Sequence, residues 1–313
     1  MKITALAGGV GGAKLAHGLA QVLPPEDVTV IVNTGDDFEH YGLYICPDLD
    51  TVCYTLAGLA NPETGWGRVD ETWNAVENAS KLGGPDWFRL GDKDLGTHLE
   101  RTRRLKGGDS LSQITRDFCK AWGVGQAILP MSDQPVRTMV DTDEGELAFQ
   151  EYFVHRRCEP RVKGFRFKHV EKAEPAPGVK EALHSADAVV ICPSNPWVSI
   201  DPILKVLSHT PALSQWENEK TVIAVSPIIG GQAVKGPAAK MYAELGIEPS
   251  AMAVANHYRD ILTVFIMDET DEQLIESVRG LNIQVHVTNT LMNSLDNRRQ
   301  LAGNILDFIG EVK

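Results

Sequence analysis

The sequence lacks paired cysteines. Its five cysteines are an odd number, they are scattered along the chain, and no two are spaced as C-x-x-C. This pattern argues against a disulfide framework and against a cysteine zinc site. We therefore expect a protein of a reducing compartment, the cytoplasm.

Long apolar runs and an excess of positive charge are also missing. No run approaches the roughly 18 apolar residues of a membrane span, and glycines follow the short run Ile3–Ala7 at once, which favours a buried strand over a signal peptide. Lys and Arg number 30 against 42 Asp and Glu, a formal net charge of −12. Such a chain is a poor candidate for binding nucleic acid, although backbone N–H groups and a few cations can still bind a small anionic nucleotide. We expect neither a nucleic acid nor a membrane as partner.

What is present is an alternation of strand and helix patterns. Near-continuous apolar runs, typical of strands covered on both faces of a parallel sheet, occur at Ile3–Ala7, Val28–Val32, Ala188–Cys192, Val222–Val225, Leu262–Met267 and Ile283–Val287. Helices are expected at Ala13–Val22, Asp48–Leu59, Glu71–Leu82, Leu111–Trp122, Ile203–Leu207, Ala238–Leu245, Asp271–Leu281 and Arg298–Ile309. The pattern predicts a Rossmann-like, doubly wound α/β fold, with a mostly parallel sheet and helices on both faces.

The middle of the chain differs, because three expected strands follow one another without helices. They are Val136–Asp141, Leu147–Val154 and Val162–Val170, and Asp143–Gly145 is a turn signal between the first two. We predict a small α+β insertion with antiparallel strands at residues 136–174, within a core made of residues 1–135 and 175–313. The sequence EPAPG (174–178) is the best linker candidate.

A glycine-rich turn, LAGGVGGAKLAHGL from Leu6, lies between the first strand and a helix. In that place helix N–H groups and the helix dipole can face phosphate. The turn is not a Walker motif, since Ala13 precedes Lys14 and Leu15 follows it, and Lys14 replaces the third glycine of G-x-G-x-x-G. A tight turn without a ligand stays the alternative.

Two acidic segments follow. The second strand ends in Asn33-Thr34-Gly35-Asp36-Asp37, and ligands gather at the carboxyl ends of parallel strands. Adjacent carboxylates there can hold magnesium, or they can form a helix cap and a solvated turn. In the next segment, PDLDT, Asp48 is placed to cap a helix and Asp50 to lie in its first turn.

These segments resemble the 2-phospho-L-lactate transferase family of deazaflavin coenzyme biosynthesis. The resemblance begins with GGVGGAKL, NTGDD and YGLYICPDLDTVCYTLAGL. It continues in the family's order through GWGRVDETWNA (65–75), DWFRLGDKDLGTHLERTRRL (86–105), LPMSDQPVRT (129–138), PSNPWVSIDPIL (193–204) and SPIIGGQAVKGPAAKM (226–241). It therefore spans almost the whole chain.

The resemblance implies a magnesium-dependent transferase. Such enzymes move a phospho-acid, 2-phospholactate or phosphoenolpyruvate, from its guanosine-diphosphate-activated donor to the ribityl hydroxyl of the deazaflavin FO. GMP leaves, and the product is the precursor of coenzyme F(420). Some segments look closer to bacterial members, which favours phosphoenolpyruvate, while phospholactate and a phosphoglycerate stay open. The family also suggests a homodimer.

The resemblance assigns roles to several residues. Asp36, Asp37 and Asp50 are the candidate catalytic residues. Asp36 and Asp37 are the candidates for holding magnesium and for orienting the attacking hydroxyl, and Asp50 and Arg89 are those for binding FO. Without the family match, Arg89 would be read as a surface cation. We expect Asp50→Asn to impair transfer more than folding, because Asn keeps the local bonds of a capping position.

The donor's guanosine diphosphate is expected to bind at Gly9, Gly11, Gly12, Lys14, Ser194, Asn195 and Lys235. An Asx turn is the alternative for the PSNP loop that holds Ser194 and Asn195. Trp66, Trp73 and Trp87 could stack on FO, but we favour the core for at least two of them.

Two other classes of protein compete with this reading. Gluconeogenesis-factor-like proteins share a similar fold and bind nucleotide sugars as regulators, but YGLYICPDLDT and DWFRLGDKDL match the transferases. A nicotinamide-dependent dehydrogenase would need a cleaner glycine fingerprint and a lone acidic residue for the ribose.

Overall fold

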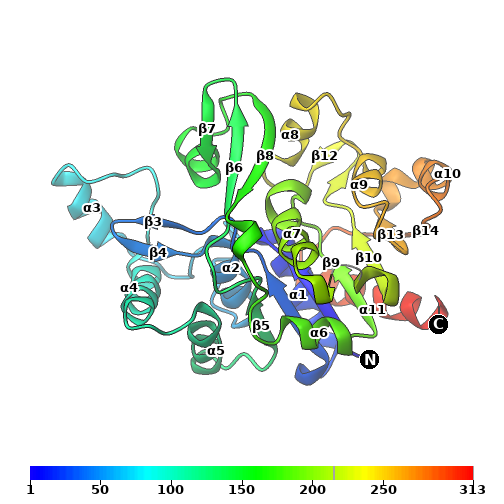
Figure 1. The fold of residues 1–313 in the computed structure, drawn as a ribbon, viewed down its shortest axis with the longest axis horizontal. Coiled ribbons are helices and arrows are strands. Elements are labelled where there is room, and N and C mark those ends of the chain that lie inside the picture. The colour runs from blue at the N-terminus through cyan, green and yellow to red at the C-terminus, as the bar shows by residue number, and fades with distance from the viewer. Residues whose placement is uncertain (214–215, 313) are drawn as a thin grey trace.

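The centre of the molecule is a seven-stranded parallel sheet (Figure 1). The computed structural model describes residues 1–213 and 216–312. The strand order is β14-β13-β10-β9-β1-β2-β5. The strands are β1 (Ile3–Ala7), β2 (Val28–Val32), β5 (Ala127–Pro130), β9 (Ala188–Ile191), β10 (Thr221–Val225), β13 (Val264–Met267) and β14 (Gln284–Val287).

Helices cover both faces of this sheet. Alternate strand residues enter two separate cores: Ala5 packs on one side and Leu6 on the other. The first core includes residues of α1 (Gly9–Val22), α2 (Pro47–Leu56), α5 (Leu111–Ala121) and α11 (Leu295–Val312). The second includes α6 (Val179–Ser185), α7 (Asp201–His209), α8 (Ala238–Glu244) and α9 (Ala251–His257). Two buried faces explain the near-continuous apolar strands, and the predicted fold class is confirmed.

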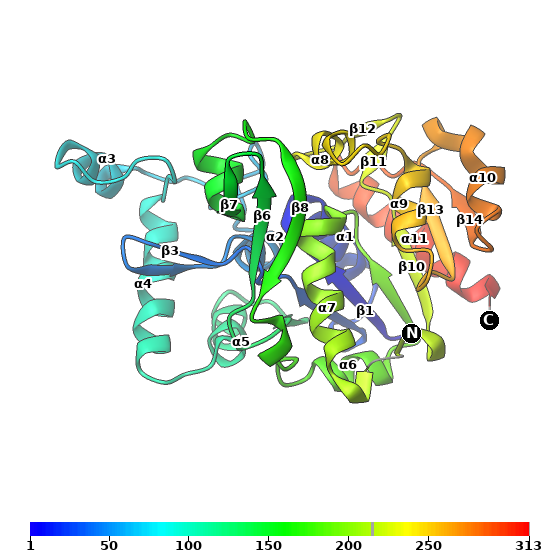
Figure 2. The same ribbon diagram turned by 45° about the horizontal axis from the view of Figure 1, so that its top comes forward.

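An arm extends from one side of the sheet (Figures 1 and 2). It comprises the hairpin of β3 (Phe38–His40) and β4 (Leu43–Ile45), α3 (Asn74–Lys81) and α4 (Asp92–Lys106). The sequence did not predict α4, because its buried residues are polar: Thr97, His98, Arg101 and Thr102. Without an apolar stripe, no helical period marks the segment.

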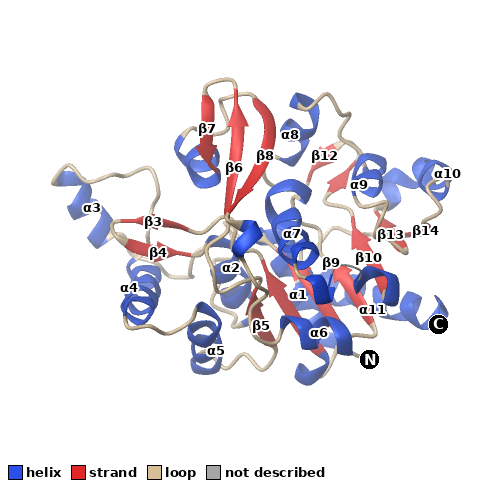
Figure 3. Cartoon of the chain, viewed as in Figure 1, coloured by secondary structure: helices blue, strands red, loops and turns tan. Residues whose placement is uncertain are grey.

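A second, antiparallel sheet stands beside the core (Figure 3). It has the order β7-β6-β8 and consists of β6 (Arg137–Thr142), β7 (Gly145–Ala148) and β8 (Val162–Lys168). The strand expected at residues 147–154 is wrong beyond Ala148, since Glu151–His155 forms a π-helical turn. The proposed division of the chain, with residues 136–174 as an insertion, stays a prediction.

Other elements also differ from the expectation: β5, α6 and α9 were not predicted. The helix expected at Asp271–Leu281 is a 3₁₀ segment, Glu269–Leu274, followed by α10 (Ile275–Arg279). A two-stranded ribbon, β11 (Ile228–Ile229) and β12 (Gln232–Ala233), was also not predicted. Among the described residues, none of the helices combines the length and apolar character needed to cross a membrane.

Candidate functional site

The site lies at the point where the winding of the sheet reverses. After β1 the chain builds the sheet toward β2 and β5, and from β9 it builds in the opposite direction. The carboxyl ends of β1 and β9 carry the glycine-rich turn and the loop of Ser194 and Asn195. In open α/β sheets ligands bind in the crevice at such a switch point.

Ser194 joins the glycine turn to this loop. Its hydroxyl accepts a hydrogen bond from the Gly8 N–H at 3.2 Å and donates one to the Gly8 carbonyl at 2.8 Å. A Cβ atom at Gly11 would lie 2.2 Å from the Pro193 carbonyl oxygen, and one at Gly12 would lie 2.6 Å from the Ser194 Oγ. These glycines therefore allow a close approach of two backbone segments.

Asn195 behaves as the Asx-turn alternative describes. Its side-chain oxygen accepts from the Trp197 N–H at 3.2 Å, and its Nδ2 donates to the Met241 Sδ at 3.3 Å. Both ends of the amide therefore contact the protein itself, and the residue shapes the loop.

Asp48 does not cap α2. That helix begins at Pro47 with Cys46 at the N-cap, and no side chain caps it. Instead, Asn33 Nδ2 donates to Asp48 Oδ2 at 2.9 Å, and the backbone of Gly9 also hydrogen-bonds the Asp48 carboxyl. Burial raises the pKa of Asp48 to about 6. A carboxyl therefore already lies at the start of α1.

Asp36 and Asp37 are buried side chains without protein partners at several oxygens. Among the described residues, no group makes a well-formed hydrogen bond to Asp36 Oδ1 or to either carboxylate oxygen of Asp37, although the Cys46 thiol lies close enough to Asp37 to lower its pKa. Burial raises the pKa of Asp37 to about 7 against the opposing charge of Arg137, and burial together with Asp48 raises that of Asp36 well above its usual range. The solvated turn is therefore ruled out. Buried carboxylates that lack donors are costly unless something else completes the site, as a cation does.

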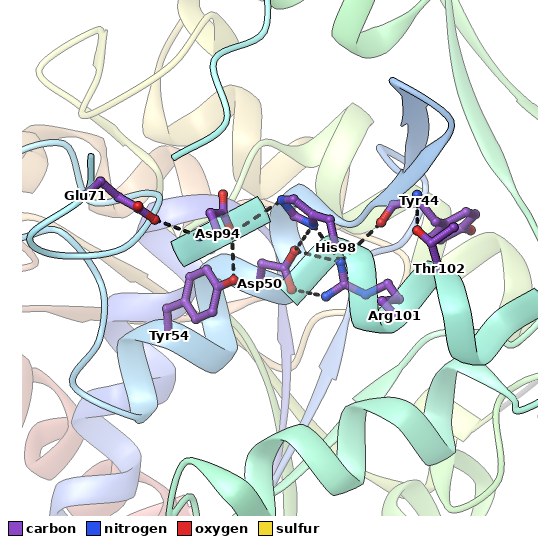
Figure 4. A network of polar contacts seen from close by, with 8 residues as sticks. All are labelled: Tyr44, Asp50, Tyr54, Glu71, Asp94, His98, Arg101 and Thr102. Carbon is purple, nitrogen blue, oxygen red and sulfur yellow. Dashed lines mark hydrogen bonds and ion pairs between the residues drawn. The ribbon is translucent and has the colours of Figure 1, made fainter. Parts of the chain in front are cut away.

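Asp50 is held by an arginine from the arm (Figure 4). Arg101 of α4 contacts both Asp50 oxygens: Nη1 donates to Oδ2 at 3.0 Å, and Nη2 pairs with Oδ1. The Arg101 side chain is only 2% exposed. Burial raises the pKa of Asp50, and the Arg101 charge opposes that rise. The sequence did not identify Arg101, because a buried arginine and a surface one look alike in a charged helix.

This pairing overturns the reason for expecting Asp50→Asn to impair transfer more than folding. Asp50 is not a capping residue, so an asparagine would leave the buried Arg101 without its counter-charge. Removing one member of a buried ion pair is strongly destabilising.

The network continues beyond Asp50 (Figure 4). His98 Nδ1 lies 3.7 Å from Asp50, and His98 Nε2 lies 3.4 Å from Asp94. The Tyr54 hydroxyl donates to Asp94 at 2.6 Å. One ligand atom each of Asp50, Asp94 and His98 lie within 4.8 Å of one another, close enough to hold a metal ion. Since Arg101 and Tyr54 already serve these carboxylates, the trio is less available to a metal than Asp36 and Asp37.

Arg89 lies in the loop before α4 and is exposed. Its guanidinium sits 4.4 Å from the centre of the Trp73 ring, a cation–π contact. The expectation that at least two of the three tryptophans fill the core is wrong: Trp66 is 48% exposed, and Trp73 and Trp87 are half-buried. Their rings therefore remain accessible in the arm.

Cations gather along α1. Lys235 Nζ donates a hydrogen bond to the Thr64 carbonyl. The neighbouring Gly65 packs against Val10 of α1, and a Cβ atom at Gly65 would lie 3.3 Å from Lys235 Nζ. Lys235 therefore lies near α1. Two turns further along, Arg298 Nη1 lies 3.0 Å from His17 Nδ1. Burial lowers the pKa of Lys14, and the positive charges of Arg298 and Lys235 lower it further. In the part of the chain that the structure describes, Lys14, Lys235 and Arg298 form no ion pair; Arg298 was not predicted.

A family model described as 2-phospho-L-lactate transferase CofD matches residues 3–300. The chain belongs to the CofD family of transferases. A phosphoenolpyruvate transferase of Streptomyces griseus is 43% identical to this CofD-family chain, with all of both chains covered. A 2-phospho-L-lactate transferase of Methanosarcina mazei is 39% identical, covering 94% of this chain and 96% of the relative.

A solved structure supports the fold of this CofD-family chain. The crystal structure of a UPF0052 family member from Bacillus halodurans superposes with a TM-score of 0.62 over 97% of this chain and 98% of that one. At 14% identity, this similarity concerns the fold alone.

Proposed function

We propose that this protein transfers a phospho-acid from its guanosine-diphosphate-activated donor to the ribityl hydroxyl of FO, with magnesium, in the cytoplasm and as a homodimer. In this reaction the hydroxyl oxygen forms a bond to the phosphorus that bears the acid. The bond from that phosphorus to GMP breaks, and the hydroxyl proton passes to a carboxylate. The observation that carries the proposal is the pair of buried carboxylates, Asp36 and Asp37, which follow β2 beside the switch point of a CofD-family fold and have three oxygens without a well-formed hydrogen bond.

Asp36 and Asp37 are the residues proposed to hold magnesium. Their orphaned oxygens fit a hard cation, which prefers one or two carboxylates together with water and phosphate oxygens. Bound there, the ion would neutralise charge on the transferred phosphate. The same carboxylates are proposed to orient the attacking hydroxyl.

On the acceptor side, Asp50 and Arg89 are proposed to bind FO. Arg101 uses one lone-pair direction on each Asp50 oxygen, and a carboxylate offers about four. Asp50 can therefore still accept a hydrogen bond from a hydroxyl. Arg89 is exposed beside the Trp73 ring, a pairing suited to a flat, polar ring system.

On the donor side, the glycine turn and the cations along α1 are proposed to bind the diphosphate. The Gly9 backbone already hydrogen-bonds the Asp48 carboxyl. We therefore assign the close phosphate contacts to Gly11, Gly12 and Lys14, and propose that Gly9 shapes the turn. Lys235 adds a second cation. Ser194 and Asn195 hold the loop that closes this side.

The acid is proposed to be phosphoenolpyruvate. The relatives with this name are 41–43% identical over the whole chain, against 39% for the phospholactate enzymes. The transfer assay compares this donor with the phospholactate and phosphoglycerate donors.

The experiment is a titration of FO, followed by its own fluorescence, with GDP and magnesium present or absent. We expect saturable binding that GDP and magnesium strengthen. Arg89→Met should weaken FO binding, whereas Arg103→Met, which removes an exposed arginine of α4, should not. Transfer assays with the three activated acids then identify the donor. No FO binding, with retained affinity for a nucleotide sugar, would refute the proposal in favour of a regulatory protein.

A further inference from the structure

Arg101 is the least expected charged residue of the fold. It is among the largest fully buried side chains, yet it carries a fixed positive charge. Burying a guanidinium is unfavourable unless its hydrogen bonds are met. Its fork faces Asp50, and Nη1 also lies 3.1 Å from His98 Nδ1 and 3.4 Å from the Tyr44 carbonyl oxygen. The burial is thus matched by partners that surround one carboxylate.

The pair joins two elements that the chain brings together only in the folded state. Asp50 lies in the first turn of α2, which packs on the parallel sheet, and Arg101 lies in α4 of the arm (Figure 4). A two-pronged contact fixes the plane of a carboxylate as well as its position. The Thr102 hydroxyl accepts from the Tyr44 N–H at 2.7 Å and anchors α4 beside β4. The placement of Asp50 therefore depends on the arm.

We infer that Arg101 is the positioning residue that orients Asp50 for the acceptor FO. The inference rests on the proposed function, in which Asp50 contacts FO. Arg101 itself acts through Asp50. With the fork in place, each Asp50 oxygen presents its remaining lone pair in a fixed direction; without it, the carboxylate can rotate and no longer meets the substrate hydroxyl in one geometry.

Arg104 provides a matched control. It lies one turn further along α4 and pairs with carboxylates too, Asp109 at 2.6 Å and Asp117 at 2.7 Å, but neither belongs to the site. Loss of Arg104 should disturb the arm without moving Asp50. A purely structural role of Arg101 would lower stability without separating the affinity for FO from the affinity for GDP.

The test compares wild type, Arg101→Lys, Arg101→Met and Arg104→Met. FO affinity is measured by fluorescence and GDP affinity by calorimetry, with thermal unfolding to establish that each variant is folded. We expect Arg101→Met to lose about ten-fold or more in FO affinity and keep its GDP affinity, and added guanidinium ion to restore part of the loss. Arg101→Lys keeps the charge but not the fork, so its KM for FO should rise while its KM for the donor stays unchanged.

Because Arg101→Met can fail to fold, the lysine variant decides. Wild-type FO affinity and KM in folded Arg101→Lys would overturn the inference, as would equal losses of FO and GDP affinity. An FO loss of the same size in Arg104→Met would also overturn it. Failure of the wild type to bind FO would instead remove the proposed function, and this inference with it.

Discussion

At the scale of single residues, two neighbouring acidic segments differ in how their buried carboxylates are paired. Asp36 and Asp37 are buried without donors at three of their four carboxylate oxygens, whereas both Asp50 oxygens are served by Arg101. Unpartnered buried charge destabilises a fold, so its presence indicates a role beyond folding. Paired buried charge fixes geometry. The two segments therefore predict different effects of the same Asp→Asn change.

For Asp37→Asn we expect a more stable metal-free protein at pH 8. The folded-state pKa is raised to about 7, so the unfolded chain releases this proton first and wild-type stability falls as pH rises from about 4 to about 7. The variant should exceed wild type by on the order of 2–4 kcal/mol at pH 8 and match it near pH 3. Urea unfolding in EDTA measures this difference.

Asp92→Asn is the control of opposite sign. Hydrogen bonds from Thr72, Ala75 and Asn74 lower the pKa of Asp92 to about 2. The stability it contributes is therefore present at neutral pH and lost as pH falls through about 2. An equal or lower stability of Asp37→Asn at pH 8 would show that the Asp37 carboxylate has partners in the metal-free fold.

For Asp50→Asn we expect a loss of stability as well as of transfer. The change leaves Arg101 buried without its counter-charge, which costs roughly 3–5 kcal/mol in comparable pairs. Urea unfolding at pH 7 measures it. A variant as stable as wild type would mean that water or another group reaches Arg101.

At the scale of elements, the site depends on how closely α1 approaches the loop after β9. Gly11 and Gly12 leave no room for a Cβ atom, and Ser194 bonds the turn on both its N–H and its carbonyl. The glycines thus serve packing whether or not phosphate binds. Helix α4 differs from α1, because ion pairs and hydrogen bonds, not apolar packing, hold its buried face in place.

Gly11→Ala should push α1 away from this loop. We expect a loss of roughly 1–3 kcal/mol in stability and a weaker affinity for GDP. Gly96→Ala is the matched change, because that glycine lies within α4 with open space at its Cβ position. It should stabilise the protein by up to about 1 kcal/mol. Thermal unfolding and GDP calorimetry measure both variants; a stable, GDP-binding Gly11→Ala would contradict the expected clash.

At the scale of the whole molecule, a tightly packed sheet contrasts with one loosely packed part of the arm, residues 61–88. Strands β1 and β9 are buried throughout, whereas Val76 is the one buried residue of α3. Glycines with positive φ, Gly65, Gly67 and Gly83, interrupt the same region. Few buried contacts imply a low free energy of local opening. This part of the arm carries Trp73 and Trp87 and borders Arg89, which is proposed to bind FO, so we expect bound FO to order it.

Hydrogen exchange tests this difference. We expect amides of residues 61–88 to exchange fastest within the described core and arm, and those of β1 and β9 slowest. Addition of FO with GDP and magnesium should slow exchange in residues 61–88 and leave β1 unchanged. Protection of this segment before any ligand is added would show an already ordered arm.

The sequence by itself determined the parallel sheet and the family. Continuous apolar strands indicate that both faces of the sheet are buried, as the two cores confirm. The segments from GGVGGAKL to SPIIGGQAVKGPAAKM occur in the family's order over almost the whole chain. Only the tertiary structure decided the states of the acidic residues. Whether Asp50 meets Arg101, and whether the charge of Arg137 acts on Asp37, depends on contacts between segments about 50 residues or more apart. Local sequence patterns do not predict such contacts, because a charged residue looks the same in the sequence whether it is exposed to solvent or buried in an ion pair.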